Sequence, residues 1–406
     1  MDYTLFVLSI SGLICPILTD FPVLWNVPSK HCYINGKLKD LSDYNIVENT
    51  GHNFNGDKVV IFYEFTFGRY PYFKKYDVNQ PVNGGSPLNE NSDTLLKEHL
   101  KIAEVNITKL IPDVNFSGLA VIDFEEWRPL LRYNGGVKSV YQREAIKFTE
   151  EKNGGHNSVH INNTATLLFD EAAKNFINAT LHLAKRLRPK AHWGLYGFPY
   201  CNYDAGKKDT DFSCSKTFQT FNDDMKYIYD VSTALFPSIY LGFEASAEQR
   251  FRYAILTEAR RIATKHTPPL PIFPYTKFEY NPLKEVDSFY NDSDICTTIK
   301  QPADMGVDGL VFWSSSSNMT LRCDNIEDYL QKTLGPIVKN VVTKVEECRQ
   351  NQCSGHGKCV IKKPENMSLL TSTCPSYTMK PDDYSCSCDP QYSGDKCSSN
   401  AASTTS

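Results

Sequence analysis

The sequence predicts an α/β fold, namely a (β/α) barrel of TIM-like form, distorted and with seven or eight strands, followed by a small disulfide-rich module. Over about 300 residues, short apolar runs alternate with longer stretches of helical period, as in repeated β/α units. Cysteines are sparse in residues 20–347, which hold five, and dense in 348–397, which hold seven. The alternative is an open doubly wound sheet. Such a sheet usually has a Gly-rich phosphate turn after its first strand, and residues 59–72 contain none.

The expected strands are nearly continuous in apolar and aromatic residues, as buried parallel strands are. They are 59–65, 119–124, 192–198, 238–243, 270–275 and 309–313. The expected helices lie between or after them, at 95–110, 170–187, 223–235, 248–265 and 325–347. In 170–187, apolar positions recur every three or four residues, which predicts one stripe facing a sheet.

The N-terminal residues 1–19 are expected to be a signal peptide. The apolar stretch 4–18 has the length of a signal core and is too short to span a bilayer, although Asp2 stands where a basic residue is usual. If Cys15 is removed with the signal, twelve cysteines remain, an even number that suits six disulfides in a secreted protein. We therefore expect secretion rather than a lysosomal location, no membrane anchor, and a monomer.

Seven Asn-x-Ser/Thr sites also favour the secretory route. They are Asn106, Asn115, Asn162, Asn178, Asn291, Asn318 and Asn366. The expected organisation is a signal peptide (1–19), a barrel (20–347), a module (348–398) and a polar tail (399–406).

Composition and motifs exclude several classes of function. The chain has 43 Lys and Arg against 47 Asp and Glu, and it lacks a basic run, which argues against a dedicated nucleic-acid binder. Apart from one His-x-x-x-His pair, His156 and His160, the nine histidines form no metal-ligand spacing, and neither a phosphate loop nor a Gly-x-Ser-x-Gly elbow occurs. We expect no metal and no cofactor.

The cysteine-rich end has the spacing of an epidermal-growth-factor-like (EGF-like) module. Cys348-x4-Cys353-x5-Cys359 is followed by Cys386-x-Cys388-x8-Cys397, with Gly394 before the last cysteine. An insertion at 361–385 separates the two halves.

The most informative expected strand end is that of residues 120–129 (AVIDFEEWRP). An extended chain alternates faces, which would place Asp123, Glu125 and Trp127 on one side and Phe124 on the other. Two adjacent carboxyls beside aromatic rings cannot both ionise easily, so one keeps the proton that a glycosidic oxygen needs. The alternative is that the two acids only pair with Arg128 or with a helix end.

Aromatic residues lie in the end regions of four other expected strands. Each alone is more often core packing, but flat rings stack on sugar faces and phenols hydrogen-bond to hydroxyls or amides, so the set indicates a carbohydrate cleft. The residues are Tyr63, Tyr196, Tyr240 and Trp313.

Several long motifs, in order along the chain, resemble those of the animal hyaluronidases. They are residues 21–29 (FPVLWNVPS), 61–63 (IFY), 120–129, 193–199 (WGLYGFP), 235–240 (LFPSIY), 309–313 (GLVFW) and 353–359 (CSGHGKC). The resemblance covers about residues 21–397 and extends into the module.

This resemblance implies a (β/α)-barrel endoglycosidase that cleaves β-1,4 bonds between N-acetylhexosamine and glucuronate. Its substrates would be the glycosaminoglycans hyaluronan and chondroitin. The proton donor would be Glu125, and the substrate's own acetamido carbonyl would be the nucleophile of a retaining reaction. Asp123 would share the Glu125 proton, and Tyr240 would orient the acetamido group. The substrate-binding residues implied with them are Asn26, Tyr63, Tyr196, Ser238 and Trp313.

Three positions depart from the family pattern. Phe124 stands where many relatives have Trp, and we expect only repacking there. Tyr200 replaces an acid in the vertebrate pattern, and Ile255 aligns with an arginine of relatives. These two changes bear on substrate choice rather than on the acid pair.

The resemblance also implies five disulfides. They are Cys32–Cys323, Cys201–Cys214, Cys348–Cys359, Cys353–Cys386 and Cys388–Cys397. Cys296 and Cys374 remain, and we expect them to bond and tether the module to the barrel, with two free thiols as the alternative.

The leading function is that of a secreted hyaluronidase-like endoglycosidase. The alternatives are a chondroitin-preferring hydrolase and a glycan-binding relative that has lost turnover.

Overall fold

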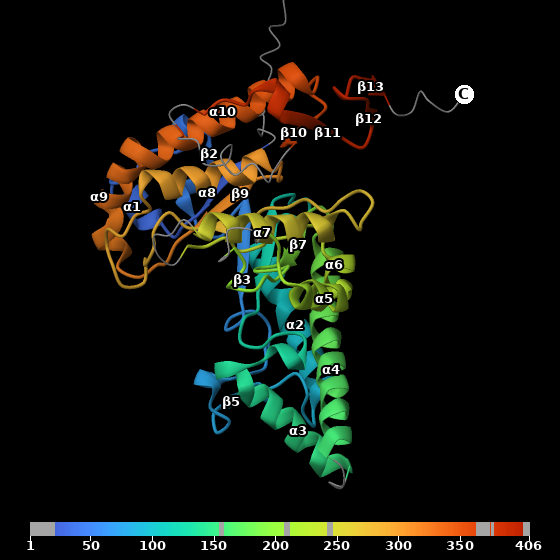
Figure 1. The fold of residues 1–406 in the computed structure, drawn as a ribbon. Coiled ribbons are helices and arrows are strands. Elements are labelled where there is room, and N and C mark those ends of the chain that lie inside the picture. The colour runs from blue at the N-terminus through green and yellow to red at the C-terminus, as the bar shows by residue number, and fades with distance from the viewer. Residues whose placement is uncertain are drawn as a thin grey trace, which may run out of the picture.

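The computed structural model of the chain describes residues 21–153, 158–206, 212–241, 247–362, 374 and 377–400 (Figure 1). The expected signal peptide, the Asn366 site and the end of the polar tail lie outside these residues. In the described part, no helix combines the length and the apolar character needed to cross a membrane.

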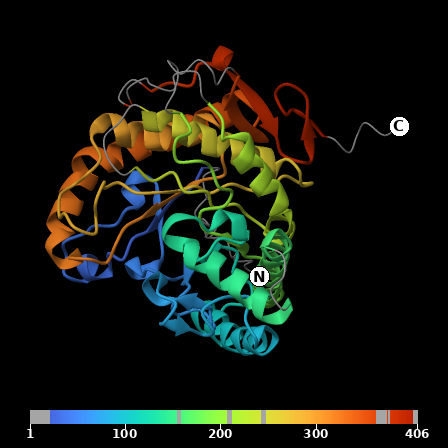
Figure 2. The same cartoon turned by 60° about the horizontal axis from the view of Figure 1, so that its bottom comes forward.

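The described strands of the barrel run parallel in two sheets. One has the order β2 (Ile46–Glu48), β1 (Val23–Asn26), β9 (Leu310–Trp313), β8 (Tyr275–Thr276), and the other has the order β3 (Val59–Tyr63), β6 (Leu119–Asp123), β7 (His192–Leu195). Residues 235–238 join β7 to β8 through isolated parallel bridges. The helices of the C-terminal half curve around the outside of these strands (Figure 2). The predicted (β/α) barrel is therefore confirmed, in a distorted form.

Prolines explain why two of the expected strands are mostly not formed. The segments 238–243 and 270–275 were expected as full strands, but the described part of the first forms one bridge, from Ser238 to Tyr275, and the second keeps only Tyr275 within β8. Pro237, Pro271 and Pro274 have no N–H, and each contributes only its carbonyl to the ladder. The pairing is therefore interrupted at this side of the barrel.

Between β2 and β3, a side chain takes the place of a strand ladder. The amide of buried Asn49 donates to the carbonyl of Val59 at 3.0 Å and accepts from the main-chain N–H groups of Lys58 and Val59 at 2.8 and 2.9 Å. The polar main-chain groups at the start of β3 are thereby satisfied. Neither β1 nor β2 was among the expected strands.

The described helices are α1 (Lys30–Ile34), α2 (Ser92–Leu110), α3 (Ser139–Asn153), α4 (Ser158–Leu187), α5 (Lys216–Asp224), α6 (Lys226–Val231), α7 (Ala247–Ala263), α8 (Asp292–Asp304), α9 (Met319–Tyr329) and α10 (Gly335–Gln352). The expected helix 223–235 is wrong at its end, because α6 stops at Val231 and the chain then becomes extended. The expected helix 325–347 is two helices separated by a wider turn at Leu330–Leu334. Helices α1, α3 and α8 were not expected, and α3 and α4 project away from the barrel (Figure 1).

The core has two parts that follow the alternation of the strands. Val59 and Ile61 of β3 belong to a cluster inside the barrel, with Val121 of β6 and Val311 of β9. The intervening residues, such as Phe62, pack outward against the helices. The next inward positions are Tyr63 and Asp123, so the alternation directs both side chains into the top of the barrel.

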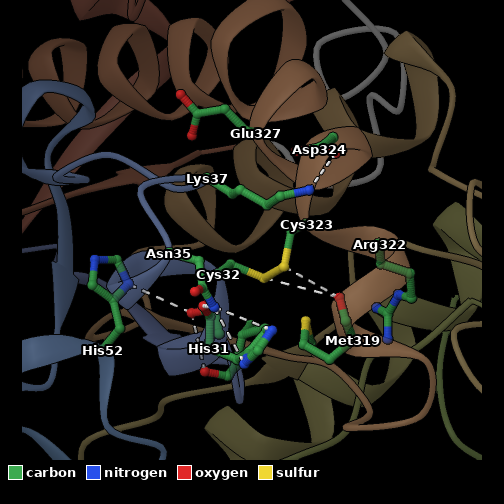
Figure 3. Close-up of a disulfide and its surroundings, with 12 residues drawn as sticks. His31, Cys32, Asn35, Lys37, His52, Met319, Arg322, Cys323, Asp324 and Glu327 are labelled. Atoms are coloured by element: carbon green, nitrogen blue, oxygen red, sulfur yellow. Dashed lines mark hydrogen bonds and ion pairs between the residues drawn. A yellow bond between two sulfur atoms is a disulfide. The ribbon is translucent and has the colours of Figure 1, made fainter.

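All six expected disulfides are present. Cys32 and Cys323 connect α1 to α9 across 291 residues of sequence, next to an ion pair of Lys37 with Asp324 at 2.7 Å (Figure 3). Cys296 on α8 bonds Cys374 with a Cα–Cα distance of 5.5 Å. The other four pairs are Cys201–Cys214, Cys348–Cys359, Cys353–Cys386 and Cys388–Cys397.

The C-terminal module packs directly on the barrel. Its sheet pairs β10 (Gly357–Ile361) with β11 (Tyr384–Cys388), and short strands β12 (Tyr392–Ser393) and β13 (Ser399–Asn400) follow. The hydroxyls of Tyr377 and Tyr384 donate to buried Asp304 of α8 at 2.8 and 2.6 Å. Helix α10 continues to Gln352, so the expected boundary at 347/348 lies within a helix.

Candidate active site

The register of the parallel strands brings the expected site residues to one level. Tyr63 pairs with Asp123, and the N–H of Tyr196 donates to the carbonyl of Ile122, one residue before Asp123. On the opposite side of the barrel, Asn26 pairs with Trp313. Ser238 and Tyr240 follow the proline-interrupted segment. The carboxyl ends of the strands thus form one layer, as in barrels of this class.

Asp123 is the last residue of β6 and is only 7% exposed. Its pKa is raised well above the usual value by burial and by the negative charges of Glu125 and Glu64, while Arg128 acts in the opposite direction. Among the described residues, its buried Oδ1 has no hydrogen-bond partner. Asp123 therefore tends to hold a proton and has an oxygen available for a further contact.

Glu125 is exposed, and its carboxyl lies on the wall of a pocket. The predicted alternation does not continue to Trp127, because β6 ends at Asp123. Trp127 is buried instead, where it stacks on Tyr70 at 5.1 Å. Phe124 also packs on Tyr70, at 4.4 Å, so it faces away from the pocket as expected. The prediction that Trp127 accompanies the two acids is wrong.

The pocket has a volume of about 270 Å³. Four expected site residues lie on its wall: Glu125, Tyr196, Ser238 and Tyr240. The Tyr196 hydroxyl and the Ser238 Oγ are 3.1 Å apart, within hydrogen-bond distance. Carboxyl, hydroxyl and phenol groups therefore converge beside aromatic rings, which suits a polar ligand with flat apolar faces.

Tyr63 and Trp313 adjoin this pocket through the Tyr240 ring. Trp313 stacks on Tyr240, with ring centroids 5.9 Å apart and planes at 19°. The indole N–H of Trp313 donates to the Tyr63 hydroxyl at 2.9 Å. The ammonium group of Lys277 lies 5.2 Å from the centre of the Tyr240 ring. The Tyr240 ring thus contacts both an indole and a cation.

Asn26 does not face open space. It is fully buried, its amide donates to the carbonyl of Phe54 at 2.7 Å, and its oxygen accepts from the Tyr275 hydroxyl at 3.2 Å. In this structure Asn26 therefore supports its neighbours in the layer and is not open to a ligand.

The departures at Tyr200 and Ile255 lie on the same pocket. The guanidinium of Arg128 donates to the Tyr200 hydroxyl at 2.7 Å and also lies over the Tyr200 ring, 4.6 Å from its centre. Burial raises the pKa of Tyr200 to about 12, so the phenol stays neutral. Ile255 adds an apolar side chain to the wall.

The sequence analysis did not identify Glu64 and Lys138 as residues near the acids. The Glu64 carboxylate accepts the main-chain N–H of Glu125 at 2.5 Å. Lys138 donates to the carbonyls of Glu125 and Glu126 at 2.6 and 3.1 Å. The only feature of the sequence that could have identified Glu64 is its position, directly after the inward-facing Tyr63.

The Asn-x-Ser/Thr sites within the described residues differ in exposure. Asn115, Asn162, Asn291 and Asn318 are exposed, whereas Asn106 and Asn178 are partly buried. The side-chain oxygen of Asn106 accepts the N–H of Gly68 at 2.8 Å, and that of Asn178 is buried. The exposed four are the more accessible acceptors.

Comparison with known proteins places the chain in a family. The family model described as hyaluronidase matches residues 15–401. The chain is 37% identical over 392 residues to a chondroitin hydrolase of Caenorhabditis elegans, covering 95% of this chain and 81% of that protein. It is 32% identical to human hyaluronidase-1, covering 89% of this chain and 82% of that protein.

Among solved structures, bee venom hyaluronidase in complex with a hyaluronic acid tetramer matches with a TM-score of 0.71 and 30% identity. The match covers 79% of this chain and 99% of that one. The barrel, the acid pair at a strand end and these relatives agree, and the chain belongs to the hyaluronidase family of glycoside hydrolases.

Proposed function

We propose that the protein is a secreted endo-β-N-acetylhexosaminidase that hydrolyses β-1,4 bonds between N-acetylhexosamine and glucuronate. The observation that carries this proposal is the position of Glu125. Its exposed carboxyl lies on the pocket wall, next to buried Asp123 and to the hydroxyls of Tyr196, Ser238 and Tyr240. A proton donor and a set of polar anchors thus meet at one place.

In the proposed reaction, Glu125 gives its proton to the glycosidic oxygen as the bond to the anomeric carbon breaks. The carbonyl oxygen of the substrate's acetamido group forms the new bond to that carbon. Water then opens the cyclic intermediate and loses a proton to the Glu125 carboxylate, so two inversions give net retention. Asp123, whose pKa is raised by burial, would share the proton with Glu125.

Tyr240 is the proposed anchor of the acetamido group. Its ring is fixed by Trp313, and burial raises its pKa, so the phenol remains a neutral hydrogen-bond donor. Tyr63, Tyr196 and Ser238 would bind sugar hydroxyls, while Asn26 acts indirectly. A rigid anchor is useful because the acetamido oxygen must approach the anomeric carbon along one direction.

Hyaluronan and chondroitin are the proposed substrates, and a preference for chondroitin is the second candidate. The Caenorhabditis relative is named a chondroitin hydrolase, and the bee venom relative was solved with a hyaluronic acid tetramer. Tyr200 and Ile255 replace charged residues of the family pattern on the same pocket. These two positions are where the choice of hexosamine would be made.

Secretion is supported by the six disulfides, because a reducing compartment keeps thiols unpaired. We propose that residues 1–19 are removed, and that the mature enzyme works as a monomer with its EGF-like module attached.

The test is release of reducing ends by the purified secreted chain from hyaluronan, unsulfated chondroitin and chondroitin sulfate, at several pH values. We expect turnover of at least one of them, with kcat/KM deciding the preference. A polymer of β-1,4-linked N-acetylglucosamine, which lacks glucuronate, is the control and should not be cleaved. A chain that binds these polymers and releases no ends would contradict the proposal and indicate a glycan-binding protein.

A further inference from the structure

We propose that Glu64 is a positioning residue for the acid pair: its carboxyl group accepts the main-chain N–H of Glu125 and so fixes the loop that carries the proposed proton donor. This role rests on the proposed function, since it has meaning only if Glu125 is the proton donor.

Glu64 contacts both acids through different groups. It follows β3 directly, and its main-chain N–H donates to the carbonyl of Asp123 at 3.0 Å, which extends the β3–β6 pairing by one residue. Its side-chain Oε2 accepts the N–H of Glu125 at 2.5 Å. Glu64 is not among the residues that line the pocket, and its side chain lies near the phenols of Tyr70 and Tyr141 instead. Glu64 therefore acts from outside the pocket.

The main chain of Glu125 is held on both sides. Glu64 binds its N–H, and Lys138 binds its carbonyl at 2.6 Å. Within the described residues, the Glu125 carboxylate itself has no hydrogen bond, and the residue is exposed. The loop is thus fixed through its backbone, which leaves the carboxyl free to reach a substrate. Loss of the Glu64 acceptor would release one of the two contacts.

Glu64 is also part of a charge cluster. The acids around it are Asp123, Glu125 and Glu126, and the cation that faces it is Lys138. The remaining titratable groups near it are the phenols of Tyr70, Tyr72, Tyr76 and Tyr141, and Arg128 acts on the pair through Asp123.

Burial raises the pKa of Glu64 to about 8, and the charges of Glu125 and Glu126 act in the same direction, whereas the N–H of Glu125 and Lys138 oppose them. With that pKa, the Glu64 carboxyl is mostly protonated below about pH 7. A neutral side chain that keeps an acceptor oxygen, such as glutamine, should therefore be able to replace it there.

The test compares Glu64→Gln and Glu64→Ala with wild type in the reducing-end assay. The glutamine keeps an acceptor for the Glu125 N–H, so we expect its kcat to stay within about threefold of wild type. Because the protonated Glu64 carboxyl and the glutamine amide are both neutral below about pH 7, the pH profile in that range should stay that of wild type. The alanine lacks the acceptor and should lose kcat by about tenfold or more with a smaller change in KM, because a small misplacement of a catalytic group is costly.

Asp170→Asn is the matched control. The Asp170 carboxylate also accepts a main-chain N–H, that of Leu131 at 2.6 Å, and burial raises its pKa to about 6, but it lies on α4 away from the acid pair. We expect this variant to keep the wild-type kcat and pH profile. This control shows whether replacing a buried carboxyl that accepts a main-chain N–H changes the activity only through a general effect on the fold.

With wild type active, a Glu64→Ala enzyme with wild-type kcat, or a Glu64→Gln enzyme that loses as much kcat as the alanine variant, would overturn the role of Glu64. If the alanine variant does not fold, Glu64→Met, which fills similar space without an acceptor oxygen, takes its place in the comparison. A wild-type enzyme without turnover would instead contradict the proposed function itself, and with it this role.

Discussion

Replacing Glu125 with glutamine should abolish catalysis while leaving the fold intact. The structure predicts both halves of this result. The side chain is exposed and makes no hydrogen bond within the described residues, so the amide removes no packing contact. The main-chain bonds to Glu64 and Lys138 do not involve the side chain and remain. The free energy of unfolding should therefore change by no more than about 0.5 kcal/mol.

The catalytic loss follows from the proton. An amide keeps the shape of the acid but cannot donate to the leaving oxygen, and general acid catalysis is worth ~10²–10⁴-fold, which is about 3–5 kcal/mol of activation free energy. The contacts made by Tyr196, Ser238 and Tyr240 are unchanged, so KM should stay within about threefold of wild type. Reducing-end release gives kcat and KM, and thermal unfolding gives the stability.

Glu104→Gln provides the control for Glu125→Gln. Glu104 is an exposed acid of α2, and the same chemical change there should alter neither rate nor stability. Residual activity of Glu125→Gln above about one tenth of wild type would exclude Glu125 as the proton donor. A large fall in melting temperature would instead show that the side chain supports the fold.

Asp123→Asn should reduce turnover severely and displace the acidic limb of the pH profile, and an unchanged limb would argue against a shared proton. Tyr240→Phe should lower kcat more than it raises KM, because the phenol contact strengthens as charge develops; a pure KM effect would make Tyr240 an ordinary binding residue. Cys374→Ser, measured by chemical unfolding, should cost about 4 kcal/mol, since the bond to Cys296 closes a loop with a sequence separation of 78. Because Glu64 has a pKa of about 8 when folded and 4.5 as its ordinary value, the folded enzyme binds more protons between these pH values, and its stability falls as pH rises through them. Glu64→Gln should reduce this fall by up to about 5 kcal/mol, and equal slopes would refute the reasoning.

The local sequence was sufficient to predict those strands that are apolar and free of proline. The runs around Val60 and Val121 were predicted because buried parallel strands are continuous in such residues, and both form ladders in the structure. The segment near Pro237 has the same apolar character and still makes only single bridges. Proline removes the N–H donors, which a count of apolar residues does not register.

The prediction of the site residues was incomplete because it depends on contacts between segments that are distant in sequence. Trp127 was expected beside the acids, because alternation was extended beyond the end of β6 at Asp123. Alternation holds only while the chain stays extended, and the aromatic partner that ends it, Tyr70, lies 57 residues earlier. Glu64 was missed for a related reason: its importance depends on the pairing of β3 with β6, which a single sequence does not reveal.

The register between β3 and β6 brings together both the predicted site residues and Glu64, which was not predicted. Tyr63 and Asp123 are paired, and both are directed into the barrel by the alternation of their strands. One residue further along, the main-chain N–H of Glu64 donates to the carbonyl of Asp123, and the Glu64 carboxyl accepts the N–H of Glu125. The position of the buried acid and the support of the exposed acid thus both depend on the pairing of β3 with β6. A shift of that register by one residue would turn Asp123 away from the interior of the barrel and separate Glu64 from Glu125, so the proposed site requires this register.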